Sequence, residues 1–277
     1  MVQPPKAPRR HDRAAPRAAR PAGRAAFAPR AAQGDGGPVW LFGIHAVRDA
    51  LTNAARVRRR LIVTANAAER LADAIATSGL TPEIADPRRF PAPLDPASVH
   101  QGAALEAEPL DWGAVKDICA PHRADPAPTV LLLDRVTDPH NVGAVLRSAE
   151  VFGARAVIAP RRHAAPESGA LAKAASGALE RQPYLRIANL ARAMDDLRAM
   201  DYALIGLDGE GAQTLPEALA ATTGRPVALI LGAEGPGLRA LTRERCDMVA
   251  RIPAASAFAS LNVSNAAAVA LYLAAAR

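Results

Sequence analysis

The chain has 277 residues, of which 50% are hydrophobic, 22% charged and 4% aromatic. This length and apolar content predict one large or two modest globular units with an aliphatic core. No apolar run approaches the roughly 20 residues that span a bilayer, so no membrane association is expected. Cys119, Cys246 and the six histidines follow no disulfide or ligand spacing. With no secretory signal either, we expect no metal and a reducing, cytoplasmic location.

The net charge of +7 is concentrated at the N-terminus, where residues 1–37 hold eight Lys or Arg and two Asp or Glu. This segment is rich in Ala, Pro and Arg without apolar periodicity, which predicts a disordered basic tail. A flexible basic arm suits a polyanion such as RNA. A solvated extension without a specific partner fits equally well, whereas the repeated prolines disfavour the amphipathic helix of a transit peptide.

Residues 38–109 predict a small α/β unit. The expected elements are strands Val39–Phe42, Leu61–Val63 and Ala103–Ala107, and helices Gly43–Leu51 and Ala67–Ser78. Arg58–Arg60 is expected to precede the second strand. The basic run Arg56–Arg60 fits either a phosphate-facing patch or a solvated charged face.

A larger unit is expected over residues 129–277, after a linker over 110–128 that begins with a helical piece, Trp112–Cys119. Strands and helices alternate through it, which is typical of an α/β fold whose parallel sheet is covered on both faces. The expected strands are Thr129–Leu133, Ala156–Ala159, Tyr184–Ile187, Tyr202–Leu207, Val227–Leu231 and Met248–Ile252. The expected helices are Val142–Phe152, Leu171–Leu179, Leu190–Met200 and Leu261–Ala276, and Thr242–Asp247 is expected to be a polar connection.

A polar loop, Asp138-Pro-His-Asn-Val-Gly-Ala-Val-Leu-Arg147, follows the first strand of this unit. Asn141 offers a donor and an acceptor, and Gly143 permits close approach of a ligand. Arg147, expected on the same side of the helix as Asn141, is suited to clamping a phosphate. A structural interpretation is equally open, in which Asp138 and Asn141 cap the helix and Arg147 pairs with Glu150.

The strand Val227–Leu231 ends in a loop with Gly232, Gly235 and Gly237. Open α/β sheets bind ligands beyond the carboxyl ends of their strands, so this loop is a candidate site. Its spacing resembles a dinucleotide fingerprint, but the position about twenty residues after Gly232 is Ile252, which cannot bind a ribose hydroxyl. A nucleotide-dependent oxidoreductase is therefore disfavoured.

A further strand end and a helix start converge on the same place. The strand Met248–Ile252 is stopped by Pro253, and the last helix opens with Ser260 at its N-cap. Two strand ends and one helix start should therefore converge on one place.

Three ordered motifs carry a resemblance to a known family: Asn141 to Arg147 in DPHNVGAVLR, Glu234 in LGAEGPG, and the closing RIP…SLNVSNAAAVALY. Together they resemble SpoU-type RNA ribose 2′-O-methyltransferases, the TrmH/RlmB group of the SPOUT superfamily. The resemblance extends over the chain through the FGIHAV and HQG segments. The chain departs from the family pattern at Ala254–Phe258, within the cofactor loop, and at Asn265.

The resemblance implies a trefoil knot in the C-terminal unit and S-adenosylmethionine bound in it, with adenosine contacts at Gly232, Ile252 and Leu261. Strand-end backbone groups and an apolar wall can hold an adenine without a charged residue. It also implies a homodimer packed through knot-region helices. The N-terminal unit resembles the ribosomal-protein-like RNA-binding domain of this group.

The reaction implied is methyl transfer to a ribose 2′-hydroxyl, which must be held in line with the methyl group and lose its proton. Arg147 matches the catalytic arginine of the family. Because a guanidinium is a poor base, we expect Arg147 to hold the neighbouring phosphate and polarise the hydroxyl. Asn141 would position Arg147 or the ribose, and Glu234 would orient the arginine. Ser260 and Asn262 would complete the pocket.

The FGIHAV and HQG segments resemble the subgroup that methylates a guanosine of 23S ribosomal RNA, which is therefore the expected substrate. A tRNA ribose is the alternative within the same class. A non-catalytic RNA-binding module of the same fold is the alternative from another class, and the presence of Asn141, Arg147 and Glu234 argues against it.

Overall fold

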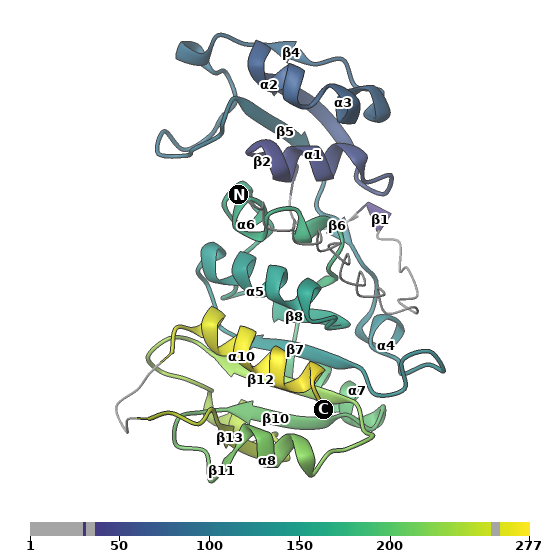
Figure 1. The fold of residues 1–277 in the computed structure, drawn as a ribbon, viewed down its shortest axis with the longest axis vertical. Coiled ribbons are helices and arrows are strands. Elements are labelled where there is room, and N and C mark those ends of the chain that lie inside the picture. Colours follow the sequence, from purple (N-terminus) through teal and green to yellow (C-terminus); the bar gives the residue numbers. More distant parts are fainter. Residues whose placement is uncertain (1–29, 32–36, 256–260) are drawn as a thin grey trace, which may run out of the picture.

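The computed structural model describes residues 30–31, 37–255 and 261–277. Two sheets dominate this part of the chain, a four-stranded sheet near the N-terminus and a seven-stranded parallel sheet formed by the rest (Figure 1). The predicted α/β class with a parallel sheet is confirmed. No helix in these ranges is both long and apolar enough to cross a membrane.

The four-stranded sheet has the order β2-β5-β3-β4, in which β5 is antiparallel to β2 and β3, and β4 is parallel to β3. Helix α1 packs on it through Val47 and Leu51, which lie on one helix face and are fully buried. The predicted helix over 67–78 is in fact two helices that meet at Leu71. The bounds are β2 Val39–Phe42, α1 Ile44–Thr52, β3 Arg58–Val63, α2 Ala65–Arg70, α3 Ala72–Ser78, β4 Glu83–Ile84, a 3-10 turn Pro87–Arg89 and β5 Ala103–Ala107.

The segment between the two sheets, residues 110–128, contains a short strand, β6 (Leu110–Asp111), and one helical turn, α4 (Val115–Ile118). The helix is shorter than expected. Strand β6 pairs with β1 (Arg30–Ala31). The other residues of the predicted basic tail, up to residue 36, lie outside the described residues.

The larger sheet has the order β11-β13-β10-β12-β7-β8-β9, and every neighbouring pair is parallel. Its strands are β7 Thr129–Asp134, β8 Ala156–Pro160, β9 Tyr184–Ile187, β10 Ala203–Leu207, β11 Gln213–Thr214, β12 Val227–Gly232 and β13 Met248–Arg251. Its helices are α5 Pro139–Val151, α6 Gly169–Ala175, α7 Leu190–Ala199, α8 Leu215–Ala220, α9 Ala240–Glu244 and α10 Val263–Ala275, with a 3-10 turn at Ala178–Glu180.

Alternate strand residues fill two cores on the two faces of this sheet. In β7, Leu131 and Leu133 pack on the side of α5, α6, α8 and α10, whereas Val130 and Leu132 pack on the side of α4 and α7. All four side chains are fully buried. Burial on both faces explains why these strands are continuous apolar runs in the sequence.

Two segments differ from the prediction. Arg58–Arg60 lies within β3 rather than before it, where Arg60 pairs with Glu83 of β4 at 2.6 Å and Arg59 pairs with Glu108. The polar connection expected over 242–247 includes the end of a short helix, α9. Sequence periodicity missed both because charged residues carry no apolar pattern and a five-residue helix is too short to show one.

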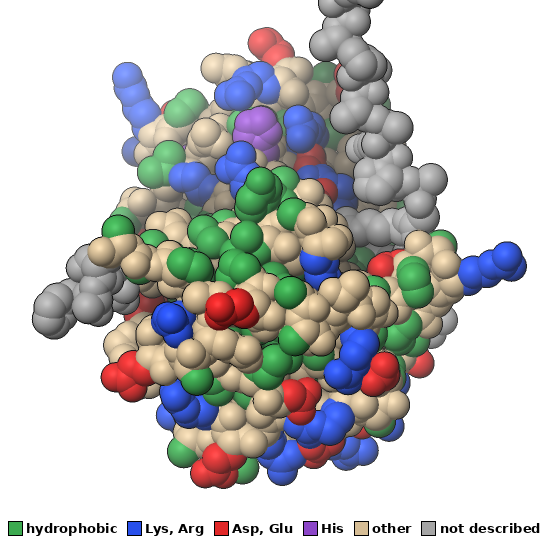
Figure 2. Space-filling view, turned by 60° about the horizontal axis from the view of Figure 1, so that its bottom comes forward, with side chains coloured by type: hydrophobic (Ala, Val, Ile, Leu, Met, Phe, Trp, Pro, Cys, Tyr) green, Lys and Arg blue, Asp and Glu red, His purple; other side chains and the backbone are tan. Residues whose placement is uncertain are grey.

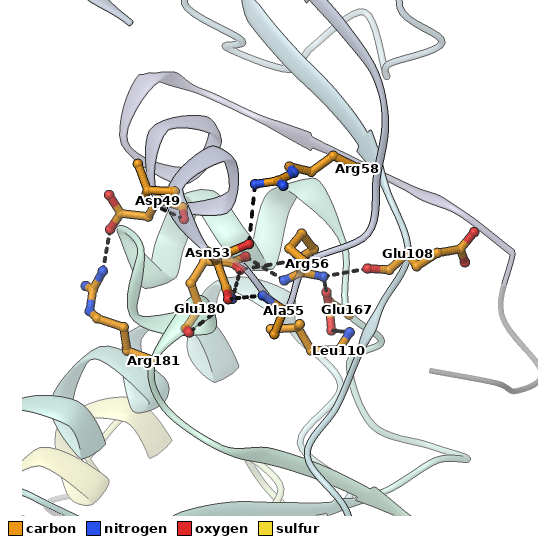
Figure 3. A network of polar contacts seen from close by, with 11 residues as sticks. Asp49, Asn53, Ala55, Arg56, Arg58, Glu108, Leu110, Glu167, Glu180 and Arg181 are labelled. Atoms are coloured by element: carbon orange, nitrogen blue, oxygen red, sulfur yellow. Dashed lines mark hydrogen bonds and ion pairs between the residues drawn. The ribbon is translucent and has the colours of Figure 1, made fainter. Parts of the chain in front are cut away.

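A buried ion cluster joins the N-terminal unit to the larger sheet's helices (Figure 3). The Arg56 side chain is 0% exposed and donates to Glu167 and to both carboxylate oxygens of Glu180, the latter at 2.5 and 3.1 Å. Asn53 adds a bond to Glu180 at 2.8 Å. Burial opposes the charge of Arg56, but the two carboxylates outweigh it and raise its pKa. Arg56 therefore cannot face a phosphate, and that hypothesis was wrong at this residue.

Candidate active site

The carboxyl ends of four parallel strands meet at one edge of the larger sheet. In the sheet register, Gly232 at the end of β12 lies beside Asp134 at the end of β7. On the other side of β12, Leu207 of β10 lies beside Leu231 and also beside Ala250 of β13. The expected convergence of strand ends is therefore observed.

The loop after β12 folds back tightly on its own strand. A Cβ at Gly232 would overlap the backbone of Gly237, so only glycine fits there. Gly235 and Gly237 have φ angles of 84° and 65°, a region that favours glycine. The fully buried Asp134 carboxylate holds the far end of the loop by accepting from Arg239 N at 3.2 Å and Nε at 2.7 Å. Sequence reasoning missed this pair, whose only signal was an acid directly after an apolar strand.

Three of the predicted site residues form one hydrogen-bonded cluster. Asn262 Nδ2 donates to Glu234 Oε1 at 2.6 Å and to Asn141 Oδ1 at 3.0 Å. Asn141 Nδ2 donates to the same Glu234 oxygen at 3.2 Å. Asn141 lies in the first turn of α5, Glu234 in the loop after β12 and Asn262 before α10. Residues more than 120 positions apart are thus joined at the carboxyl edge of the sheet.

Asn262 also starts the last helix. Its Oδ1 accepts from Ser264 N at 2.9 Å and from Ser264 Oγ at 2.6 Å, so it is the N-cap of α10. The cap was expected at Ser260, which lies outside the described residues. The side chain that orders this helix is therefore the same one that links the two other motifs.

Arg147 does not share the side of the helix that Asn141 occupies. Six residues of α-helix separate the two side chains by about 120° around the axis. Arg147 is exposed and makes no hydrogen bond or ion pair with any residue that the structure describes. The alternative pairing with Glu150 is not formed either, because Glu150 binds Arg181 at 2.5 Å and 3.2 Å. Asp138 does cap the helix, accepting from His140 N at 2.9 Å.

Gly143 has a different role from the one expected. A Cβ at this position would lie 2.5 Å from Ala174 Cβ and 2.7 Å from Leu171 O, both in α6. The close approach that glycine permits here is therefore that of a neighbouring helix, not of a ligand. It sets the position of α5, which carries Asn141 and Arg147.

The three residues predicted to contact an adenosine lie around this edge. Gly232 ends β12, Ile252 directly follows β13, and Leu261 precedes the cluster residue Asn262. Ile252 is half-buried and Leu261 is 48% exposed. Partly buried strand-end backbone groups beside apolar side chains fit an adenine, which needs apolar contact and a few backbone hydrogen bonds.

These features define an α/β protein with a candidate ligand site at the carboxyl edge of a parallel sheet. Residues 128–272 match the model of the SpoU rRNA methylase family. The chain belongs to this family, and the membership predicted from the three motifs is confirmed.

Named relatives and solved structures cover most of the chain. The 23S rRNA (guanosine-2′-O-)-methyltransferase RlmB of Escherichia coli K12 is 36% identical over 236 residues, 84% of this chain and 96% of that protein. The protein of the same name from Ralstonia nicotianae is 39% identical over 236 residues, 84% and 93% of the two chains. The AdoMet-bound rRNA methyltransferase structure from Sinorhizobium meliloti has a TM-score of 0.70 at 25% identity and covers 86% of each chain.

Proposed function

We propose that this protein transfers a methyl group from S-adenosylmethionine to the 2′-hydroxyl of a guanosine in 23S ribosomal RNA. The observation that carries the proposal is the cluster of Asn141, Glu234 and Asn262, which unites three separate motifs at the ligand edge of a SpoU-family fold. The named relatives support ribosomal RNA over a tRNA ribose, and the intact cluster argues for an enzyme over a non-catalytic binding module.

S-adenosylmethionine, when bound, supplies an electrophilic methyl group. Gly232, Ile252 and Leu261 would hold its adenosine through backbone groups and apolar contact. Arg147 is exposed and unpaired among the described residues, so its guanidinium is free to bind the phosphate beside the target ribose and polarise the hydroxyl.

The asparagine amides supply orientation. Glu234 accepts from both Asn141 and Asn262, which fixes the rotation of the two amides before any ligand arrives. Amides locked in this way can hold a ribose at little cost in side-chain freedom. The predicted part of Ser260 in this pocket remains a prediction.

We also propose the trefoil knot and the homodimer implied by the family. The strand order supports a threaded C-terminus, because β12 lies between β10 and β7, β13 lies beyond β10, and the chain then returns to pack α10 on α5. A dimer through these helices is supported by the exposed apolar residues Val151, Val269 and Tyr272 on α5 and α10. Figure 2 shows apolar side chains gathered in the middle of one face, above mixed charges near its lower edge.

The N-terminal unit, residues 38–109, is proposed to bind the RNA and the unit over 129–277 to methylate it. Both basic and acidic side chains lie over the upper, more distant part of Figure 2, which is the N-terminal unit, so the support for this role is the family resemblance of the unit and not its net charge. The cytoplasm, where ribosomal RNA is assembled into particles, is the location that this substrate requires.

The test is transfer of labelled methyl from S-adenosylmethionine to unmodified 23S rRNA and, separately, to unmodified tRNA. A 2′-O-methyl group makes the adjoining 3′ linkage resistant to alkali, so the modified nucleotide can be mapped. Label at one alkali-resistant guanosine of 23S rRNA is the expected result. Label in tRNA alone would overturn the substrate, and cofactor binding without transfer to either RNA would favour the non-catalytic module.

Arg147→Ala tests the assigned chemistry. Loss of one positioned donor to the reacting groups costs about 100-fold or more in rate, so methylation should fall at least that far. Affinity for S-adenosylmethionine should stay within about twofold, since Arg147 is not among the residues proposed to hold the adenosine. Arg192→Ala, at an exposed position on α7, is the matched control. A fully active Arg147→Ala enzyme would remove the role.

A further inference from the structure

A cavity of about 500 Å³ lies in the N-terminal unit, away from the cluster described above. It opens between the start of α2, strand β4 and the His100-Gln101-Gly102 segment, which the methyl-transfer chemistry does not use. Its size is within the range of pockets that hold small organic ligands. The residues that line it include Asn66, Arg70, Ile84, His100 and Gln101.

Part of the His-Gln-Gly segment has a structural explanation. Gly102 has φ 76°, a Cβ there would overlap Thr64, and its carbonyl accepts from Thr64 N at 2.8 Å. Gln101 Oε1 accepts from Ile44 N at 3.1 Å and so caps α1. Gln101 does this from a left-handed φ of 55°, an uncommon conformation for a residue with a side chain. These contacts account for the glycine at position 102 and for the amide oxygen of Gln101. They do not account for the amide nitrogen of Gln101 or for the other polar side chains at the cavity.

The remaining side-chain polar groups at the cavity are mostly donors, together with the amide oxygen of Asn66, and they have no partner among the described residues. Asn66 and Arg70 are exposed and make no hydrogen bond there, and Gln101 Nε2 makes none either. His100 accepts from Gly102 N through Nδ1 at 3.1 Å, which leaves Nε2 as a donor on the neutral ring. No Asp or Glu is among the lining residues. A donor-rich cavity without acids suits a ligand that presents carbonyl or phosphate oxygens.

An aromatic pair adjoins the same cavity through His100, the member of the pair that lines it. The ring of His100 stacks on that of Phe90, with centroids 4.1 Å apart and planes 20° from parallel. Such a pair can accept a third flat ring on its free face. Stacking on aromatic side chains is the usual way in which proteins hold unpaired RNA bases.

General attraction for the RNA backbone cannot replace a local site here. Residues 38–109 contain eight Lys or Arg and eight Asp or Glu, so this unit has no net charge. Recognition by the unit must therefore come from particular groups arranged for particular contacts. Within the described part of this unit, unpaired donors and an aromatic stack occur together at this cavity.

The cavity is also tied to the helices of the active site. Lys173 of α6 donates from Nζ to Val99 O at 2.9 Å, next to the His-Gln-Gly segment. Helix α6 in turn packs against Gly143 of α5, the helix that carries Asn141 and Arg147. One RNA chain lying across α6 can therefore reach both places.

We propose that this cavity binds one unpaired nucleotide of the RNA substrate, with its base on the His100–Phe90 stack and its oxygens on Arg70 and Asn66. The inference rests on the proposed function, because it supplies a second contact for the same RNA. The nucleotide is one that is not methylated, since the cavity lies in the other unit from the Asn141 cluster.

The test uses the full-length protein and unmodified 23S rRNA transcript without S-adenosylmethionine, so that binding is measured apart from methyl transfer. Arg70→Gln combined with Asn66→Ala should weaken RNA binding about 5- to 100-fold, and Phe90→Leu should weaken it by a similar factor. The loss of Arg70 should also lower the slope of log affinity against log salt by about one. Arg192→Gln, an exposed arginine on α7, is the matched control and should bind as the unchanged protein does.

Methyl transfer provides the second readout. The half-saturating RNA concentration should rise in the cavity variants, whereas kcat and cofactor affinity should stay within about twofold. Ultraviolet crosslinking should join RNA to the peptide that holds Phe90 and His100. Thermal unfolding identifies a variant that has merely lost its fold, and the exposed Arg70 and Asn66 keep the test valid if Phe90→Leu proves unstable.

The two proposals fail in different ways. If the Arg70→Gln and Asn66→Ala double variant binds RNA as tightly as Arg192→Gln does, the proposed nucleotide site is wrong. The proposed methyltransferase activity is not affected by that result. If the cavity variants lose RNA affinity but the unchanged protein transfers no methyl group, the proposed activity is wrong. The proposed nucleotide site is then still supported. Crosslinks confined to residues outside 64–102 also overturn the cavity.

Discussion

Arg147 is left unpaired because a second arginine holds the carboxylate nearest to it on the helix. Glu150 lies three residues after Arg147 in α5, a spacing at which opposite charges pair. Instead, Arg181 binds both oxygens of Glu150 and also Asp49, the latter at 2.5 Å (Figure 3 shows the Asp49 contact). The hydrogen bond to Glu150 is the largest of the influences that raise the pKa of Arg181. We therefore predict that Arg181 acts as a positioning residue, which keeps the Arg147 guanidinium available by holding Glu150.

Arg181→Gln should release Glu150 to pair with Arg147. A pair of this kind near the surface is worth a few tenths of a kcal/mol to about 1 kcal/mol, so kcat for methyl transfer should fall about two- to fivefold. The measurement is the initial rate at saturating RNA and S-adenosylmethionine. Affinity for the cofactor should not change.

Two further variants separate this effect from a general loss of structure. Asp49→Asn removes the charge of the other carboxylate that binds Arg181 without freeing Glu150, and should keep full kcat. Combining Glu150→Gln with Arg181→Gln removes the competing charge and should restore the rate. A double variant as slow as Arg181→Gln alone would contradict the explanation.

Gly143→Ala should destabilise the protein and displace α5, the helix that carries Asn141 and Arg147. The added Cβ would meet Ala174 Cβ at 2.5 Å and the backbone of Leu171 at 2.7 Å, and backbone cannot move aside as a flexible side chain can. Overpacking of this kind costs about 1–3 kcal/mol in the free energy of unfolding. Gly209→Ala, where no atom lies within 4 Å of the new Cβ, should be neutral or slightly stabilising. Urea unfolding of both variants measures the difference in the free energy of unfolding. Equal values would show that α5 and α6 can move apart without a measurable cost.

At the level of elements, the sequence predicted the helices and strands whose apolar pattern lies within their own residues. The apolar run expected at Val227–Leu231 is β12, and the helix expected over 261–276 is α10. The arginines of β3 could not be placed, because they are stabilised by Glu83 and Glu108 from distant segments. Local periodicity cannot register a partner that only folding brings close.

The candidate site also has a part that the sequence could predict and a part that it could not. The meeting of Asn141, Glu234 and Asn262 follows from the rule that carboxyl ends of parallel strands share one edge. The bonds among them, and the engagement of Glu150 by Arg181, depend on side-chain positions that no spacing specifies. A glycine pattern likewise cannot distinguish room for a ligand from room for a helix, which is why Gly143 was misjudged.

Arg56→Leu tests the ion cluster that joins the two units. Removing the cation leaves Glu167 and Glu180 buried without a counter-charge, which typically costs about 3–5 kcal/mol in the free energy of unfolding. Arg60→Leu is the matched control, because its pair with Glu83 is exposed and screened by solvent, so its loss should change the free energy of unfolding far less. Chemical denaturation of the two variants should differ accordingly, and similar losses would show that the cluster contributes little.

The loss in Arg56→Leu should depend on pH. Burial raises the pKa of Glu167, and the charge and hydrogen bond of Arg56 oppose this rise only in part. Without Arg56, the pKa of Glu167 should therefore rise further. A carboxyl group whose pKa is raised on folding stabilises the fold fully below its ordinary value near 4.5, and this contribution is lost as pH rises through the folded value. The deficit relative to the unchanged protein should therefore shrink as pH falls from 7 towards 5. A deficit that is constant over this range would show that the carboxylates are not the cause.

At the scale of the whole molecule, the helices that carry the site also present an uncovered apolar surface. Val151 is 69% exposed and Tyr272 59%, and Tyr272 lies edge-on to Phe152 with ring centroids 5.9 Å apart. Val269, one turn before Tyr272 on α10, is 37% exposed. A continuous apolar patch on adjacent helices is typical of a surface that associates. If two copies meet there, dimerisation is linked directly to α5 and thus to Arg147.

Tyr272→Glu should convert the proposed dimer into a monomer, because a carboxylate placed at the centre of an apolar interface must lose its hydration without gaining a partner. Sedimentation velocity at micromolar concentration measures the change, and methyl transfer should fall with the dimer fraction and recover as protein concentration rises. Leu241→Glu, at a 56% exposed position on α9 across the sheet, places the same charge on an apolar site outside the patch and should leave both the mass and the rate unchanged. If Tyr272→Glu sediments with the same mass as the unchanged protein, the dimer interface lies elsewhere. A fully active monomer would show that each chain forms its active site without a partner.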